Sequence, residues 1–168
     1  MEQYKKAVQE FANKQEDYTF PNKGASHAVI VLEELFNNSK EIKFFSNKLD
    51  YDILKTIFSS IKNFIKNGGV LELILDEPNI VNNDIVTYLC EKNVSIKIAN
   101  DEFRNSVKKL STQDDIYHFA IGDNKSFRIE IDTQEYKAIC NFNNPEISQK
   151  FVSVFDDFFN KLDNYKGC

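Results

Sequence analysis

Between residues 114 and 144, the sequence places an imidazole, a guanidinium and a carboxylate on one predicted β-hairpin. His118 lies on the first strand, and Arg128 and Glu130 lie on the second. An imidazole oriented by a carboxylate can act as a nucleophile or a general base, and a guanidinium can clamp a phosphate group. The same side chains can instead form a structural hydrogen bond and an ion pair, which is the simpler interpretation.

The pattern of apolar residues indicates how the two strands pair. Residues 116–122 and 126–132 alternate between apolar and polar positions, as half-buried strands do. A two-residue turn would mix the two sets on each face, whereas a three-residue loop keeps the apolar residues on one face. The apolar pairs in that register are Tyr117–Ile131, Phe119–Ile129 and Ile121–Phe127. We therefore expect His118, Arg128 and Glu130 to share the other face, with His118 opposite Glu130.

Further polar residues are candidates for ligand binding. Asp123 begins the predicted loop, where an Asp side chain usually bonds to nearby backbone. Asn141 and Asn143 could bind phosphate or substrate, or could equally secure the loop before the last helix. His27 lies at the start of a predicted helix. A surface position is the simpler interpretation of His27, and the alternative is that it faces the hairpin.

Composition limits the classes of function. The 168 residues suit one domain over residues 1–168, and 42% apolar residues can build a substantial core. A net charge of −5 gives no overall attraction to nucleic acid or to anionic membranes. No apolar run reaches the length of a membrane span, and the charged start lacks a secretory hydrophobic core. We therefore expect a cytoplasmic protein with no membrane span.

Motifs that hold metals or cofactors are not found in the sequence. Cys90, Cys140 and Cys168 are widely spaced and cannot all pair with one another, so reduced thiols are expected. The sequence has no glycine-rich phosphate loop, no serine nucleophile elbow and no metal-ligand spacing. No cofactor and no metal are expected.

The order of the predicted elements indicates the fold class. Strands are predicted at 42–45, 70–75, 94–99, 116–122, 126–132 and 136–142, and helices at 2–16, 26–37, 51–66, 82–92 and from 144 onward. Residues 1–24 are predicted as an N-terminal helix and loop, and residues 101–115 fit no pattern. Ser26 is the expected N-cap of the second helix. The alternation of strands and helices predicts an α/β fold with a mixed, mostly parallel sheet flanked by helices.

The stretch HFAIGDNKSFRIE and the elements around it resemble the phospholipase D superfamily. That family's signature reads His-x-Lys-x-x-x-x-Asp, followed by a Gly-Ser-x-Asn segment. EIKFFSNKL resembles the family's first core strand, NGGVLELILD a Gly-Val-x-Val-x-x-Leu-x-Asp strand, and KAICNFNNPE the Asn-bearing strand before the closing helix. The resemblance covers roughly residues 25–160 and implies a fold like one half of a phospholipase D enzyme.

The resemblance also implies which positions of the catalytic motif are altered. Aligning Asp123 with the signature Asp puts Ile116 at the position of the nucleophilic His and His118 at that of the phosphate-binding Lys. The segment after the turn reads Phe-Arg-Ile-Glu in place of Gly-Ser, and Asn141 or Asn143 corresponds to the family's Asn. Active members need two motifs, in one chain or across a dimer. The usual phosphohistidine chemistry is therefore not expected, and a homodimer is.

Three functions fit these residues. The first is a phospholipase D-like binding module whose ligand face includes His118, Arg128 and Glu130 and takes a phosphate-containing ligand or nucleic acid. The second is a divergent phosphodiesterase or nuclease, in which His118 reacts, Glu130 orients it and Arg128 clamps the phosphate. The third is a protein-interaction subunit. We prefer the first because the catalytic motif is altered.

Overall fold

The computed structural model describes residues 1–46, 51–76, 84–111 and 114–168. Within these ranges, seven strands form one sheet in the order β1-β7-β6-β5-β2-β3-β4. The strands are β1 (Phe20–Asn22), β2 (Glu41–Ser46), β3 (Val70–Leu75), β4 (Ser95–Ile98), β5 (His118–Gly122), β6 (Ser126–Asp132) and β7 (Lys137–Asn141). The helices are α1 (Glu2–Lys14), α2 (Ala25–Asn38), α3 (Tyr51–Lys66), α4 (Asp84–Glu91), α5 (Asp101–Lys108) and α6 (Pro145–Phe159). The predicted α/β fold with a mixed sheet is confirmed.

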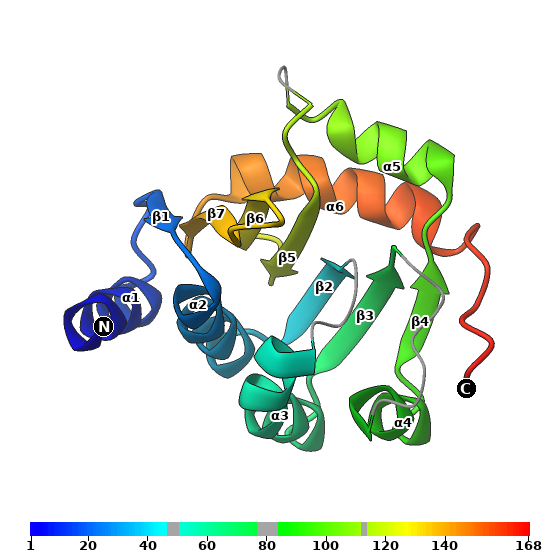
Figure 1. Ribbon diagram of the computed structural model, residues 1–168, viewed down its shortest axis with the longest axis horizontal. Helices are drawn as coiled ribbons and strands as arrows, with labels where there is room; N and C mark the ends of the chain where they lie inside the picture. The colour runs from blue at the N-terminus through cyan, green and yellow to red at the C-terminus, as the bar shows by residue number, and fades with distance from the viewer. Residues whose placement is uncertain (47–50, 77–83, 112–113) are drawn as a thin grey trace.

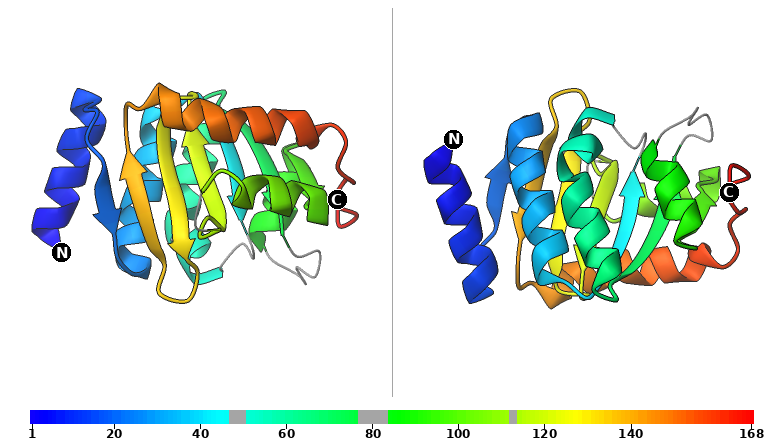
Figure 2. Two further views of the ribbon diagram at one scale, coloured as in Figure 1. Left: turned by 90° about the horizontal axis from the view of Figure 1, so that it is seen from above. Right: turned by 90° about the horizontal axis from the view of Figure 1, so that it is seen from below.

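Helices cover both faces of the sheet (Figures 1 and 2). Helices α2, α3 and α4 lie on one face, and α5 and α6 lie on the other. Successive residues of a strand point to opposite faces, so each strand contributes to two cores. In β5, Ala120 packs into the core with α2 and α3, whereas Phe119 packs against Phe155 of α6. His118 is two residues from Ala120 and therefore points toward α2 and α3.

The expectation of a mostly parallel sheet is wrong. β2–β3 and β3–β4 pair in parallel. In contrast, β1–β7, β7–β6, β6–β5 and β5–β2 pair antiparallel. A parallel pair needs a crossover connection, which α3 supplies between β2 and β3. The turns that join β5, β6 and β7 are too short for a crossover, so these strands can pair only antiparallel.

The sequence analysis missed two elements. Residues 18–24, expected as a loop, contain β1, whose Asn22 is only 1% exposed. The polar stretch after β4 contains α5, which buries Phe103 and Val107 on one side. The Asn100 side chain caps this helix by accepting a hydrogen bond from the backbone N–H of Phe103 at 2.9 Å. Both elements are short, and most of their residues are polar or exposed, which hid them from a search for apolar periodicity.

Helix starts were predicted with mixed success. Asn144 caps α6 as expected, since its side chain accepts a hydrogen bond from the backbone N–H of Ile147 at 3.0 Å. The expected cap at Ser26 is wrong, because α2 begins one residue earlier, with Gly24 as its N-cap. Gly24 has φ 86°, a backbone conformation that favours glycine. The predicted helix start at residue 82 lies outside the described residues.

The expectation of reduced thiols is also wrong. Cys90 in α4 and Cys168 form a disulfide, with their Cα atoms 5.2 Å apart. Cys140 stays free and fully buried, and burial raises the pKa of its thiol to about 12. A separation of 78 residues gave no sign of the pairing in the sequence. Because disulfides persist mainly in oxidising compartments, the bond removes one argument for the cytoplasmic location, which stays a prediction.

The segment that leads to Cys168 folds back along β4. The backbone N–H of Ile98 donates to the carbonyl of Asp163, and that of Tyr165 donates to the carbonyl of Ile96, both at 2.9 Å. This antiparallel bridge and the disulfide together fix the segment beside β4 and α4.

Candidate functional site

The hairpin has the register that the alternation of residues predicts. His118 pairs with Glu130 and Ala120 pairs with Arg128, so the predicted face is confirmed. Asp123 and Asn124 in the loop have positive φ angles of 48° and 58°, which Asp and Asn tolerate better than most residues. The expected pair of Tyr117 with Ile131 is not part of the ladder, because β5 begins only at His118 and Tyr117 is 40% exposed.

His118 lies between two carboxylates. Its Nδ1 is 3.5 Å from Oε2 of Glu130, and its Nε2 is 3.5 Å from Oδ2 of Asp76. The residue is only 6% exposed. Burial opposes a charged ring, but the hydrogen bonds and charges of Asp76 and Glu130 outweigh it and raise the pKa of His118 above its usual value. Each ring nitrogen thus faces a carboxylate oxygen, an arrangement that favours the protonated ring.

Arg128 is buried at 6% exposure and is held by its neighbours. Its Nε donates to the side-chain oxygen of Asn22 at 2.9 Å, and its Nη2 lies 3.8 Å from Oε1 of Glu130. Nη2 also reaches the carbonyl oxygen of Tyr136 at 3.5 Å. The Asn22 side chain donates to that same carbonyl at 3.0 Å. The guanidinium is thus held in place by β1, β6 and the loop before β7.

Asp76, directly after β3, connects His118 to a second arginine. The Nε of Arg104 in α5 donates to the Asp76 carboxylate, and its Nη2 donates to the Asp76 carbonyl at 2.7 Å. Arg104 also bonds to Asp101 at 2.9 Å and to the carbonyl of Ala99 at 3.1 Å. Burial works to raise the pKa of the Asp76 carboxyl, but His118 and Arg104 together lower it below its usual range.

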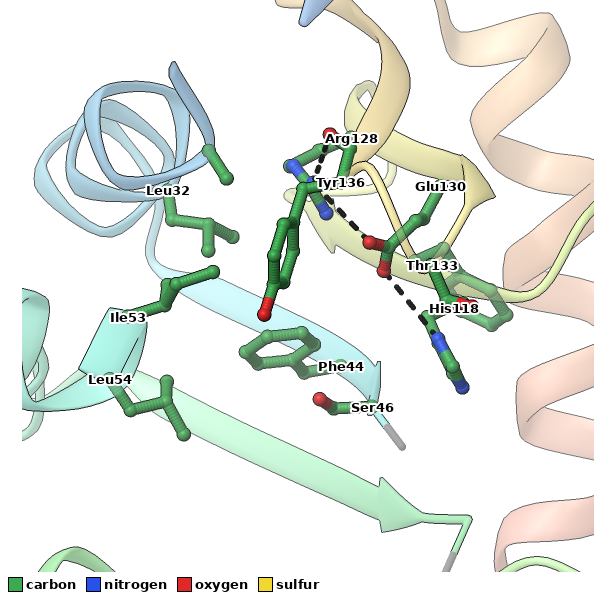
Figure 3. A pocket seen from close by; sticks show the side chains of 12 residues that line it. Leu32, Phe44, Ser46, Ile53, Leu54, His118, Arg128, Glu130, Thr133 and Tyr136 are labelled. Atoms are coloured by element: carbon green, nitrogen blue, oxygen red, sulfur yellow. Dashed lines mark hydrogen bonds and ion pairs between the residues drawn. The ribbon is translucent and has the colours of Figure 1, made fainter. Parts of the chain in front are cut away.

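A cavity of about 190 Å³ lies beside this cluster (Figure 3). It is lined by Ala28, Leu32, Phe44, Ser46, Ile53, Leu54, His118, Phe119, Arg128, Glu130, Thr133 and Tyr136. A second cavity of about 200 Å³ is lined by Phe45, Asp76, Arg104, Lys108, Ile116, Tyr117, His118 and Thr133. His118 and Thr133 line both. The site lies where β2 and β3 end, and the carboxyl ends of parallel strands are the usual place for ligands in α/β folds.

The other predicted site residues lie away from the cluster. The Asp123 carboxylate accepts hydrogen bonds from the backbone N–H groups of Lys40 and Glu41 at 2.8 and 2.9 Å. Asn141 pairs with Phe127 near the loop end of the hairpin, far along β6 from Glu130. Its amide donates to Asp17 at 2.9 Å and Thr19 at 3.1 Å.

Asn143 and His27 are likewise held in local contacts. The backbone N–H of Asn143 donates to the Asn141 side chain at 2.8 Å. The His27 ring stacks on Tyr4 of α1 with ring centroids 3.7 Å apart. Burial lowers the pKa of His27 below its usual value. Neither residue lines the two cavities that contain His118.

Sequence reasoning missed Asp76, Asn22 and Arg104, which complete the cluster. A signal existed for Asp76, because it is a carboxylate directly after a buried strand and so belongs to the carboxyl edge of the sheet. Asn22 and Arg104 lie on the two elements that the analysis missed, so no signal pointed to them.

Metal-ligand clusters and membrane-spanning helices are both absent from the described ranges. Among those residues, no group of three or more His, Cys, Asp or Glu side chains is arranged to hold a metal ion. No helix in the same ranges is both long and apolar enough to cross a membrane.

Comparison with solved structures identifies the fold. A phospholipase D family member, Nuc from Salmonella typhimurium, superposes with a TM-score of 0.59 at 14% identity, over 88% of this chain and 99% of Nuc. The chain has the phospholipase D-like fold. Phosphatidylserine synthase from Haemophilus influenzae Rd KW20 agrees, with a TM-score of 0.54 at 14% identity, over 87% of this chain and 39% of the synthase.

The chain is also similar in structure to TrmBL2, an archaeal chromatin protein with a novel mode of DNA binding. The TM-score is 0.62 at 12% identity, over 96% of this chain and 61% of TrmBL2. No protein-family model and no curated protein sequence matches the chain. At these identities the likeness establishes the fold alone. Within it, Ile116 is 8% exposed and packs in the core that includes Phe103 and Phe155.

Proposed function

We propose that this chain is a phospholipase D-like binding module that does not use phosphohistidine chemistry. One observation carries the proposal: both ring nitrogens of His118 face carboxylates, at 3.5 Å each. A histidine nucleophile or general base needs a nitrogen with a free lone pair. Flanking carboxylates favour the protonated ring, which has no such lone pair. The isoleucine at position 116, where the resemblance puts the nucleophile, supports the same conclusion.

The arginines support binding over phosphate chemistry. A phosphate clamp needs a guanidinium with two free parallel N–H groups. Arg104 is occupied by Asp76, Asp101 and the Ala99 carbonyl. Arg128 donates through Nε to Asn22 and through Nη2 to the Tyr136 carbonyl, and it is ion-paired with Glu130. Most side chains around the cavity are buried, and Arg128 is held by Asn22 and Glu130, as a preformed binding site requires.

The competing function is a divergent phosphodiesterase or nuclease that uses His118, Arg128 and Glu130. Purified protein incubated with bis-(p-nitrophenyl) phosphate, single-stranded DNA and RNA separates the two functions. We expect no hydrolysis above background. Hydrolysis that disappears in His118→Ala, and persists in His27→Ala, would overturn the proposal. His27→Ala is the matched control because it removes the second histidine, which lies outside both cavities that contain His118.

Nucleic acid is a separate candidate ligand, suggested by the likeness to TrmBL2. The net charge of −5 and the paired arginines argue against it. Fluorescence anisotropy with labelled single- and double-stranded DNA at low salt measures whether the chain binds nucleic acid. We expect no saturable binding in the micromolar range, and salt-sensitive binding there would favour a nucleic-acid module.

We further propose that two copies associate, because active members of the superfamily combine two motifs and this chain carries one. Light scattering at micromolar concentration should give twice the chain mass. A monomer across that range would remove the argument. A different protein that co-purifies with the chain would instead favour the interaction-subunit function.

A further inference from the structure

The size of the cavity limits its ligand to a small molecule. Its volume of about 190 Å³ is somewhat larger than the engineered cavity of about 150 Å³ that holds benzene in another protein. One substituted ring therefore fits. A complete nucleotide or a lipid would extend well outside it.

Among the described residues, the charges around the cavity cancel when the His118 ring, held between two carboxylates, is protonated. His118 and Arg128 carry positive charge, and Glu130 and Asp76 carry negative charge, at separations of 3.5 to 3.8 Å. Arg104 adds one more positive charge, which Asp101 balances. A bound ion would leave one charge in this buried site without a partner. Removing a charge from water without a compensating partner is unfavourable, so the cluster disfavours anions and cations alike.

The cavity has an apolar side and a polar side. Figure 3 shows Leu32, Ile53 and Leu54, from α2 and α3, across the cavity from Arg128 and Glu130 of β6. The Glu130 carboxylate has more acceptor positions than its neighbours occupy and can take a hydrogen bond from a ligand N–H or O–H group. A ligand that matches both sides has an apolar face and at least one hydrogen-bond donor along an edge.

We infer that the cavity binds an uncharged single-ring molecule, with its apolar face against α2 and α3 and its hydrogen-bonding edge toward Glu130 and Arg128. This inference rests on the proposed binding function and names its ligand class. It differs from phosphodiester recognition because the selective feature is the absence of charge. Planar heterocycles and saturated hydroxylated rings share this chemistry.

Three probes of nearly equal size and shape test the charge rule: benzamide is neutral, benzoate is an anion and benzamidine is a cation. Each is titrated into ¹⁵N-labelled protein at concentrations up to millimolar, and backbone amide shifts are followed. We expect benzamide to shift amides of cavity-lining residues, with both ions binding at least about tenfold more weakly. Equal or tighter binding of either ion overturns the inference, as does the absence of cavity shifts with benzamide.

Two variants connect the binding to the cavity. Leu32→Phe fills space at the apolar side and should abolish the benzamide shifts. Asn37→Phe places the same ring on the exposed end of the same helix and should leave them unchanged. Benzamide that binds Leu32→Phe as well as wild type would place its site elsewhere and overturn the inference.

Arg128→Gln tests the charge balance without filling the cavity. Losing one positive charge leaves the cluster with a net negative charge, so benzamidine should gain affinity relative to benzamide. If Arg128→Gln kept the wild-type preference for benzamide over benzamidine, charge balance would have no role in binding. This result does not depend on whether Leu32→Phe folds. Uracil and methyl glucoside, added as separate probes, distinguish a planar ligand from a saturated one, and cavity binding of either supports the inference.

The proposed function and the inference fail in different ways. If benzoate binds best while no hydrolysis occurs, the binding module stands and the charge rule is wrong. If hydrolysis depends on His118, the binding function itself is wrong, whatever the probes do.

Discussion

At the loop end of the β5–β6 hairpin, polar side chains tie the loop and β7 to neighbouring segments; at the opposite end, charged side chains pair with one another beside a cavity. Asp123 accepts two backbone hydrogen bonds from the start of β2, and Asn141 ties β7 to residues before β1. His118, Arg128 and Glu130 instead form a charged network against the cavity wall. Hydrogen bonds fix the loop end to neighbouring segments, whereas the cavity end has space for another molecule.

The comparison shows that residue type alone does not identify a site. Asp and Asn occur at or near both ends, and the resemblance to phospholipase D singled out residues at both. The difference is what each polar group bonds to and whether a cavity lies beside it. Polar groups that tie segments together and line neither cavity stabilise the fold, and a buried network that faces a cavity is a candidate for binding.

The largest effect should come from breaking the charged network. Arg128→Met leaves Glu130 and Asn22 without their guanidinium partner inside the protein, and we expect a loss of about 3–5 kcal/mol in the free energy of unfolding. Lys137→Met, which removes an exposed cation from β7, should cost far less, because exposed ion pairs contribute little. Urea denaturation measures both. A loss below about 1 kcal/mol for Arg128→Met would mean that the network is not held together as described.

A smaller effect is expected at the loop end. Asp123→Ala removes the acceptor for two backbone N–H groups and should cost about 1–3 kcal/mol in urea denaturation. Part of that loss would reflect the positive φ of 48° at this position. Asp123→Asn is the matched control, since Asn tolerates that conformation and keeps one acceptor oxygen. If Asp123→Ala and Asp123→Asn lost the same free energy of unfolding, the two hydrogen bonds of Asp123 would contribute nothing measurable.

The pH dependence of stability should come from the cavity end. The pKa of His118 is raised by Asp76 and Glu130 against the effect of burial, so the folded state binds the proton more tightly than the unfolded state. The stability that His118 gains from binding this proton is complete below the unfolded pKa of about 6.5. It is lost as the pH rises through the folded pKa. The stability advantage of wild type over His118→Asn should therefore shrink as the pH increases. An advantage that grew with pH would show that the ring is neutral when folded.

The smallest effect to be measured is the difference between the two histidines. One NMR titration should give a pKa above the ordinary value for His118 and below it for His27, whose pKa burial lowers. Glu130→Gln should lower the pKa of His118 and leave that of His27 unchanged. Identical titration of His118 in both proteins would show that Glu130 does not hold its proton.

The hairpin could be predicted because its information is local. Alternation over residues 116–132 determines which side chains share a face, and a sheet with two buried faces does not tolerate a slip of one residue. That argument placed His118 opposite Glu130 correctly. The alternation also predicted a pair at Tyr117, which is wrong, because alternation does not mark where a strand ends.

The partners of the cluster could not be predicted because they come from distant segments. Asn22 meets Arg128 across 106 residues, and Arg104 meets Asp76 across 28. Such contacts depend on how strands are ordered in the sheet, and the sequence pattern does not state that order. The same limit applies to the proportion of parallel strands and to the Cys90–Cys168 disulfide. Of the three partners, only Asp76 could have been predicted, because it directly follows a recognisable strand.

The backbone bridge to β4 restricts how two copies could join. An open edge strand offers free N–H and C=O groups on which another chain can add a strand. Here Asp163 and Tyr165 already occupy the outward groups of Ile96 and Ile98, and the disulfide at Cys168 keeps them in place. A second copy therefore cannot continue the sheet past β4 while this segment stays bound. Association of two copies would have to use another surface, so mutations along β4 should leave the oligomeric state unchanged.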